Sequence, residues 1–212
     1  MIQTRIFKVS DLQTDEIIRL ARAVEHGAVA VLPTDTVYGI GTGAYQEESI
    51  HSIYALKKRP STSPLQLLAG NSAQVRQAAI FGPQAEKLAT CFWPGALTMI
   101  LPPAPAGKSL ARGFAGLGFR VPGNPFLVQF LQAMSVPMAC TSANLHGQAV
   151  ITDEKILLDT FDGKVDYIFL SGTLSPQASS VVDLMADPLL LREGAISRAT
   201  LEQTLGVPLR VK

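Results

Sequence analysis

The stretch AVAVLPTDTVYGIGTGA, residues 28–44, carries the clearest signal for the fold. Its first residues are an apolar run that predicts a buried strand, and Pro33 ends that strand. The polar residues 34–36 follow at once, and we expect them to lie exposed at the strand tip. Ligands of open α/β sheets bind where strands end in this way. The same residues could instead build an ordinary turn that Asp35 caps.

Helical and strand patterns alternate irregularly on both sides of this stretch. Apolar residues at helical spacing predict helices, and short apolar runs predict strands. The expected helices cover residues 14–26, 47–58, 72–79, 84–91, 125–134, 153–161 and 198–205. The expected strands cover 28–32, 65–69, 96–101, 118–121, 138–142, 166–170, 180–184 and 189–192, and the Pro- and Gly-rich segment 102–116 is expected to be a loop. This mixture predicts an α/β (α+β) fold with a twisted mixed β-sheet flanked by helices.

The composition is that of a compact globular protein. Of its 212 residues 47% are hydrophobic and 17% are charged, a balance that argues against disorder. We expect a single domain over residues 1–212, with its core at about 14–200. Lys and Arg number 18 against 17 Asp and Glu, so no overall positive field exists to capture nucleic acid or an anionic membrane. Any positive site must therefore be local.

The sequence gives little indication of a metal site or of a membrane-spanning segment. Cys91 and Cys140 are far apart in the sequence, which is typical of free thiols in a reducing compartment. His26, His51 and His146 have no Cys or carboxylate neighbours at ligand spacing, so no tightly bound, protein-ligated metal is expected. The chain shows neither an apolar signal segment at its N-terminus nor an uncharged run long enough to span a bilayer. We therefore expect a soluble, cytoplasmic protein.

The densest positive charge lies in KKRPSTSPLQLL, residues 57–68. Lys57 and Arg59 follow the end of a predicted helix, because Pro60 disfavours helix at the residue before it. Cations at this position could simply complement the helix dipole. They could also bind a polyanion, since a guanidinium matches phosphate geometry and the hydroxyls of residues 61–63 add neutral donors.

Three further apolar strands carry polar side chains at one end. Ser142 and Asn144 follow the strand in CTSANLHG (140–147), Ser179 precedes the strand in SSVVDL (179–184), and Arg192 ends LLLREG (189–194). Each could bind a ligand or merely form a turn or an ordinary charged strand end. The sequence holds no nucleophile elbow, Walker loop or dinucleotide fingerprint. An enzyme built this way would act by positioning and charge stabilisation.

Eight motifs follow one another along the chain: PTDTVYGIG, YALKKRP, PLQLL, FWPGALTMIL, GFRVP, TSAN, SSVVDL and LLREGAIS. Taken in this order, they resemble the YrdC family of threonylcarbamoyl-AMP synthases. The resemblance is to the short, single-domain form of the family. It implies a nucleotidyltransferase that makes threonylcarbamoyl-AMP and pyrophosphate from L-threonine, bicarbonate and ATP, the first step of threonylcarbamoyladenosine modification of tRNA. It also implies a sheet curled around a concave, positively lined cavity, Mg²⁺ bound with ATP, and a downstream tRNA-modifying transferase complex as partner.

The resemblance assigns a role to each matching position. Lys57 and Arg59 match a K-x-R signature and would hold the ATP phosphates as the catalytic cations. The other implied ATP contacts are Ser63, Asn144, Thr152 and Arg192, and the implied threonine contacts are Thr36, Arg120, Ser142 and Ser179. One departure is Leu68, which stands where many relatives have histidine.

Three alternatives remain open at this point. The protein could adenylate the carbamate of another amino acid, which the departure at Leu68 permits. It could be a non-catalytic protein that binds double-stranded RNA or tRNA, although its near-neutral charge counts against this. It could also be a paralogue that has lost the activity.

Overall fold

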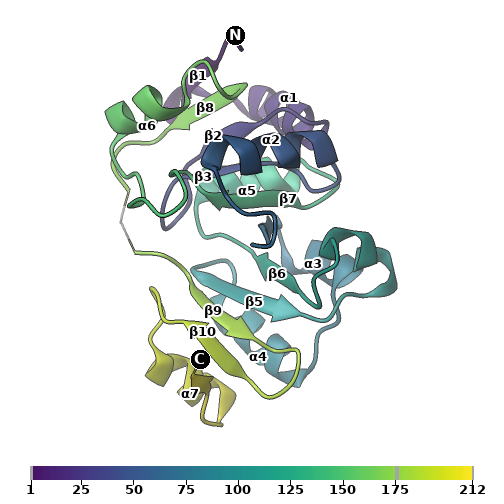
Figure 1. Cartoon of the computed structure of the whole chain (residues 1–212). Helices are drawn as coiled ribbons and strands as arrows, with labels where there is room; N and C mark the ends of the chain where they lie inside the picture. The colour runs from purple at the N-terminus through teal and green to yellow at the C-terminus, as the bar shows by residue number, and fades with distance from the viewer. Residues whose placement is uncertain (1, 175–176, 212) are drawn as a thin grey trace.

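The computed structural model describes residues 2–174 and 177–211, whose strands form one mixed sheet with helices on both faces (Figure 1). The strands are β1 (Arg5–Lys8), β2 (Ala30–Leu32), β3 (Gly39–Gly43), β4 (Gln66–Leu68), β5 (Leu97–Leu101), β6 (Leu117–Arg120), β7 (Met138–Ser142), β8 (Tyr167–Leu170), β9 (Ser180–Asp183), β10 (Leu189–Arg192) and β11 (Arg210–Val211). The α-helices are α1 (Thr14–Glu25), α2 (Glu47–Lys57), α3 (Ser72–Ala78), α4 (Pro83–Phe92), α5 (Pro125–Gln132), α6 (Glu154–Phe161) and α7 (Arg198–Leu205), and two 3-10 helices are η1 (Val9–Asp11) and η2 (Pro105–Ala111). Across the sheet the strands follow the order β1-β8-β2-β3-β7-β4-β6-β5-β9-β10-β11.

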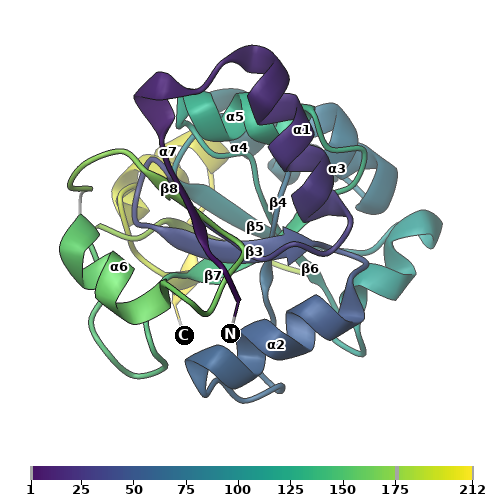
Figure 2. The ribbon, with the colours of Figure 1, turned by 90° about the horizontal axis from the view of Figure 1, so that it is seen from above.

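Two apolar cores lie on opposite faces of the first half of the sheet, β1-β8-β2-β3-β7. Ala30 and Leu32 of β2 belong to the core formed with α1 and α5. Val31, between them, belongs to the core that contains Ile53 of α2 and Phe161 of α6. Successive strand residues point to opposite faces, so a continuous apolar run is what a strand buried on both sides requires. Figure 2 shows α1 and α5 on one side of this half and α2 and α6 on the other.

The second half of the sheet has a core of its own. Met99 of β5 and Phe119 of β6 pair across an antiparallel ladder and pack with Leu88 of α4 and Leu201 of α7. Strand β4 joins the halves, since it pairs antiparallel with β7 on one side and parallel with β6 on the other. The predicted mixed sheet flanked by helices is therefore confirmed.

Every helix and strand expected from the sequence has a counterpart, but β1, β3 and β11 were missed. Strand β3, GIGTG, contains three glycines, which are depleted in strands and hide its pattern. They are needed because β3 runs close to its neighbours. A Cβ at Gly41 would collide with the backbone oxygen of Ala139 in β7, and one at Gly43 with the backbone of Glu25 in α1.

The expectation that 102–116 is an irregular loop was wrong in part. Residues Pro105–Ala111 form the 3-10 helix η2, whose N-cap, Ala104, donates its N–H to the backbone oxygen of Ala78 at 2.9 Å. Gly107 lies so close to the same oxygen that a Cβ would clash with it. The segment is thus packed onto α3, a long-range contact that composition cannot reveal.

Among the described helices, none combines the length and the apolar character needed to cross a membrane.

Candidate active site

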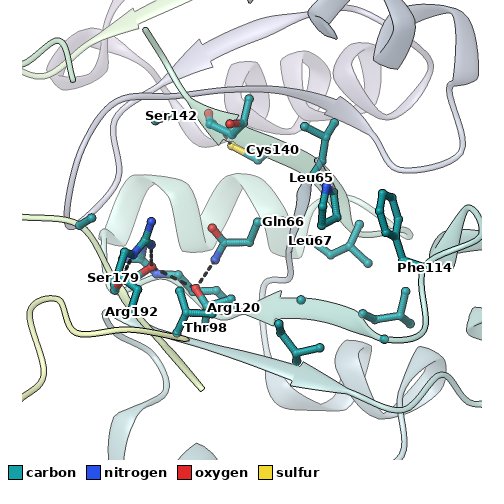
Figure 3. A pocket seen from close by; sticks show the side chains of 18 of the residues that line it. Leu65, Gln66, Leu67, Thr98, Phe114, Arg120, Cys140, Ser142, Ser179 and Arg192 are labelled. Atoms are coloured by element: carbon teal, nitrogen blue, oxygen red, sulfur yellow. Dashed lines mark hydrogen bonds between the residues drawn. The ribbon is translucent and has the colours of Figure 1, made fainter. Parts of the chain in front are cut away.

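The sheet encloses a cavity of about 350 Å³ beside the strands where its two halves meet (Figure 3). Its described lining contains no aspartate and no glutamate, but it holds four arginines, Arg59, Arg112, Arg120 and Arg192. The expected concave, positively lined cavity is therefore confirmed. Arg120 and Arg112 pair with Asp35 and Glu47, which lie outside the lining, whereas Arg59 and Arg192 have no carboxylate partner among the described residues. These two guanidinium groups favour an anionic ligand, because charges removed from water need opposite partners.

Arg59 reaches the cavity because α2 ends abruptly. The residue after the helix, Lys58, adopts a left-handed conformation with φ 51°, which turns the chain before Pro60. The Arg59 side chain is half-buried and donates to the backbone oxygens of Pro64 at 3.1 Å and Ser63 at 3.4 Å. A guanidinium has five N–H groups, so Arg59 keeps donors for a ligand.

Lys57 lies behind the cavity wall, with only 1% of its surface exposed. Its Nζ donates to the backbone oxygens of Ser142 and Asn144, and the Asn144 Oδ1 is 3.4 Å away. Burial, and to a lesser extent the charge of Arg59, lowers the pKa of Lys57 to about 8. Its ammonium group therefore fixes the loop that follows β7 and does not line the cavity.

Asn144 completes the same loop. Its Nδ2 donates to the backbone oxygens of Gln148 at 2.7 Å and Leu145 at 3.1 Å, and its Oδ1 accepts from Ser142 Oγ at 2.5 Å. Ser142 lines the cavity, whereas Asn144 does not. Lys57 and Asn144 together thus hold Ser142 at the cavity wall.

Arg120 of β6 is only 4% exposed and links three segments. It donates to Asp35 Oδ1 at 2.6 Å, to Thr36 Oγ1 at 3.0 Å and to the backbone oxygen of Gly95 at 2.9 Å. Two of its five N–H groups remain for a ligand. The expectation that residues 34–36 lie exposed was wrong for Thr34 and Thr36, which are 6% and 3% exposed because they form this buried network.

A chain of hydrogen bonds crosses the opposite wall (Figure 3). Arg192 of β10 donates to Ser179 Oγ at 3.2 Å and to the Ser179 backbone oxygen at 3.0 Å. Ser179 Oγ is 3.0 Å from Thr98 Oγ1, to which Gln66 Nε2 donates at 2.8 Å. Burial, followed by the nearby charge of Arg120, lowers the pKa of Arg192. An anionic ligand would offset this repulsion.

The structure brings together six of the side chains that the sequence suggested. Those that line the cavity are Thr36, Arg59, Arg120, Ser142, Ser179 and Arg192. Four others, Lys57, Ser63, Asn144 and Thr152, lie outside its lining. Leu68, where the resemblance led us to expect a histidine, is 2% exposed and packs into the core with α1 and α5.

Sequence reasoning missed several polar lining residues, among them Gln66, Thr98 and Arg112. Gln66 and Thr98 could have been found as single polar residues inside the apolar strands LQLLA and ALTMIL. Arg112 gives no such signal. Its backbone is left-handed, and its side chain donates to Glu47 and to the backbone oxygen of Ala44.

A family model described as "Telomere recombination", Sua5/YciO/YrdC, matches residues 22–194. The chain belongs to the Sua5/YciO/YrdC family. A Bacillus subtilis (strain 168) member named threonylcarbamoyl-AMP synthase is 33% identical over 198 residues, which cover 90% of this chain and 57% of that protein. The chain spans 57–61% of the length of its B. subtilis and Pyrococcus abyssi relatives.

Solved structures of family members share the fold. The crystal structure of P. abyssi Sua5 complexed with L-threonine superposes with a TM-score of 0.90 at 29% identity, and the match covers 99% of this chain and 63% of that one. Escherichia coli YciO gives a TM-score of 0.84 at 25% identity over 95% of this chain and 100% of its own.

Proposed function

We propose that this protein is an L-threonylcarbamoyladenylate synthase, which joins L-threonine, bicarbonate and ATP into threonylcarbamoyl-AMP and pyrophosphate. The observation that carries the proposal is the cavity whose described lining holds four arginines, of which Arg59 and Arg192 have no carboxylate partner among the described residues. ATP and bicarbonate are anions and threonine carries a carboxylate, so the site needs buried cationic donors. The B. subtilis relative is named for this activity, and the P. abyssi relative was crystallised with L-threonine.

Threonine and ATP would occupy different walls of the cavity. The threonine carboxylate would pair with the free N–H groups of Arg120, and the hydroxyls of Thr36, Ser142 and Ser179 would surround the amino acid. Arg59 and Arg192 would hold the ATP phosphates. Lys57 and Asn144 would serve the ATP site through the loop that they fix, and Ser63 and Thr152 stay assigned to ATP by their positions in the family motifs.

The chemistry needs no protein nucleophile. The threonine amine and bicarbonate give a carbamate and water, a carbamate oxygen attacks the α-phosphorus of ATP, and pyrophosphate leaves. Negative charge grows on the phosphate oxygens in the transition state, and fixed guanidinium groups stabilise it without reorganising. Arg59 and Arg192 would supply this stabilisation.

Magnesium fits this site as a companion of ATP. Among the described residues no three His, Cys, Asp or Glu side chains gather into a metal-binding group, and the described lining offers arginines and hydroxyls. Mg²⁺ bound to the triphosphate would supply further positive charge as pyrophosphate leaves. The protein's own arginines would bind the phosphate oxygens that Mg²⁺ does not contact.

The product would pass to a tRNA-modifying transferase complex. We place the reaction in the cytoplasm, because the free cysteines Cys91 and Cys140 suit a reducing compartment.

The test is mass spectrometry of the purified protein with ATP, Mg²⁺, bicarbonate and each common amino acid in turn, while pyrophosphate release is followed. We expect a threonylcarbamoyl-adenylate only with threonine. An adenylate with another amino acid would keep the mechanism and change the substrate. ATP binding without any adenylate would overturn the proposal and favour an inactive paralogue or an RNA-binding protein.

A further inference from the structure

Gln66 provides an acceptor in a cavity otherwise rich in donors. Among the described lining residues Gln66 is the one with a side-chain amide, and none of the others is Asp, Glu or Asn. Its Nε2 donates to Thr98 Oγ1 at 2.8 Å, and its Oε1 accepts no hydrogen bond from any described residue. Figure 3 shows this oxygen pointing away from Thr98, into the open part of the cavity. Gln66 is half-buried, so a ligand that displaces water from this oxygen must supply a donor in its place.

Hydrogen bonds through Thr98 and Ser179 hold the amide in this orientation. Thr98 is 5% exposed and lies between Gln66 and Ser179, which is 3% exposed. Arg192 anchors the far end of the chain, because a guanidinium can only donate and Ser179 Oγ accepts from it at 3.2 Å. With its nitrogen committed to Thr98, the amide presents its oxygen to the cavity.

The donor can be identified by elimination, and this step rests on the proposed function. Threonine carries a carboxylate, a nitrogen and a side-chain hydroxyl. The carboxylate is assigned to Arg120, and the nitrogen bears the carbamate that must face the α-phosphate of ATP. The hydroxyl is the group that still needs an acceptor, and the hydroxyls of Thr36, Ser142 and Ser179 are already engaged with Arg120, Asn144 and Arg192. We propose that Gln66 is a specificity-determining residue that accepts a hydrogen bond from the threonine hydroxyl, with Thr98 as its positioning residue.

Valine tests this assignment, because it has nearly the shape of threonine with a methyl group in place of the hydroxyl. In its complex the Gln66 oxygen would be shielded from water without a partner. A site built to bond a substrate hydroxyl discriminates in this way against the analogue that lacks it. The protein should therefore use threonine in preference to valine.

The experiment measures KM and kcat for threonine and for valine by pyrophosphate release, with ATP, Mg²⁺ and bicarbonate. Gln66→Met keeps the length of the side chain and removes the acceptor. We expect a KM for threonine raised about three- to tenfold, the net effect of one hydrogen bond, with kcat and the KM for valine nearly unchanged. Gln77→Met, at an exposed position of α3, is the matched control and should change nothing.

Thr98 supplies a second, independent variant. Thr98→Val removes the hydroxyl that orients the amide at almost constant volume, so it should also reduce the preference for threonine, and Thr98→Ser should restore it. A general packing defect would affect both amino acids alike and would lower the thermal midpoint, which is recorded for every variant.

The possible outcomes separate the two proposals. Equal losses for threonine and valine in Gln66→Met would overturn the hydroxyl assignment, and so would a wild-type protein that does not distinguish the two amino acids. Adenylate formation with wild-type protein but an unchanged threonine KM in Gln66→Met would overturn the role of Gln66 alone. Absence of any adenylate with wild-type protein would overturn the proposed function and this inference with it.

Discussion

Lys57 and Arg59 stand two residues apart, yet the fold places their charges in different regions with different tasks. Lys57, in the last turn of α2, is 1% exposed and donates to backbone oxygens of the loop after β7. Arg59, beyond the turn at Lys58, is half-buried and lines the cavity. The comparison teaches that a cationic motif can combine one residue that shapes a loop with one that meets the ligand. Variants of the two residues test whether their roles differ in this way.

The largest effect is expected at Arg59. Arg59→Ala removes a donor that would bind the phosphates in the transition state, and such losses lower turnover by about 10²–10³-fold. The free energy of unfolding should change by less than about 1 kcal/mol, because the Arg59 contacts inside the protein are hydrogen bonds to two backbone oxygens that water can replace. Pyrophosphate release and urea denaturation measure the two quantities. Lys58→Ala is the matched control, and equal losses in both variants would contradict the role of Arg59.

Lys57 should show its effect mainly in stability. Lys57→Met keeps an unbranched side chain but leaves the buried backbone oxygens of Ser142 and Asn144 without their donor. We expect a loss of roughly 1–3 kcal/mol in the free energy of unfolding at pH 7, measured by urea denaturation. A variant as stable as the wild type but inactive would show that the ammonium acts on the nucleotide directly, and the comparison would fail.

The pH dependence of stability tests the burial of Lys57. Its pKa is lowered to about 8 from an ordinary value of 10.5, mainly by burial. Between these values the unfolded chain keeps a proton that the folded protein has released, so the free energy of unfolding rises with pH there. Wild type should therefore gain stability relative to Lys57→Met from pH 8 to pH 10. A constant difference across urea titrations in this range would show that the ammonium is not desolvated.

The smallest effect is expected for the ion pair of Arg112, which follows η2 and contacts Glu47 at the start of α2. Its Nε lies 3.0 Å from Glu47 Oε1, and the Glu47 side chain is 57% exposed. Exposed ion pairs contribute about 0.2–1 kcal/mol, so Glu47→Gln should cost no more than this in urea denaturation. Glu48→Gln is the control, since it removes the same charge from the same helix turn. A larger loss specific to Glu47 would mean that η2 is held to α2 chiefly by this pair.

Local rules were sufficient where an element carries its own signals. Helix α5 begins at Pro125, directly after Asn124, whose Oδ1 accepts the N–H of Leu127, and its apolar residues Phe126 and Phe130 recur at helical spacing. The two-sided apolar character of 28–32 likewise predicted a strand buried on both faces. Such features depend on neighbours within a few residues, which a sequence displays directly.

Local rules failed where a distant segment decides. Strand β3 is rich in glycine because β7 and α1 approach it closely, and η2 is ordered by its contact with α3. Thr36 is buried because Arg120, 84 positions away, donates to it. Propensity cannot anticipate contacts of this kind, because the partner lies in another element.

By itself, the sequence determined the class of the fold, the positions of most helices and strands, and six polar side chains that line the cavity. Only the tertiary structure decided which cations face the cavity, that Lys57 holds a loop 85 positions away, and that Gln66 presents an oxygen to the ligand. The physical reason is that burial, hydrogen-bond partners and lowered pKa values arise from segments far apart in the chain, which meet only after the sheet has closed around the cavity.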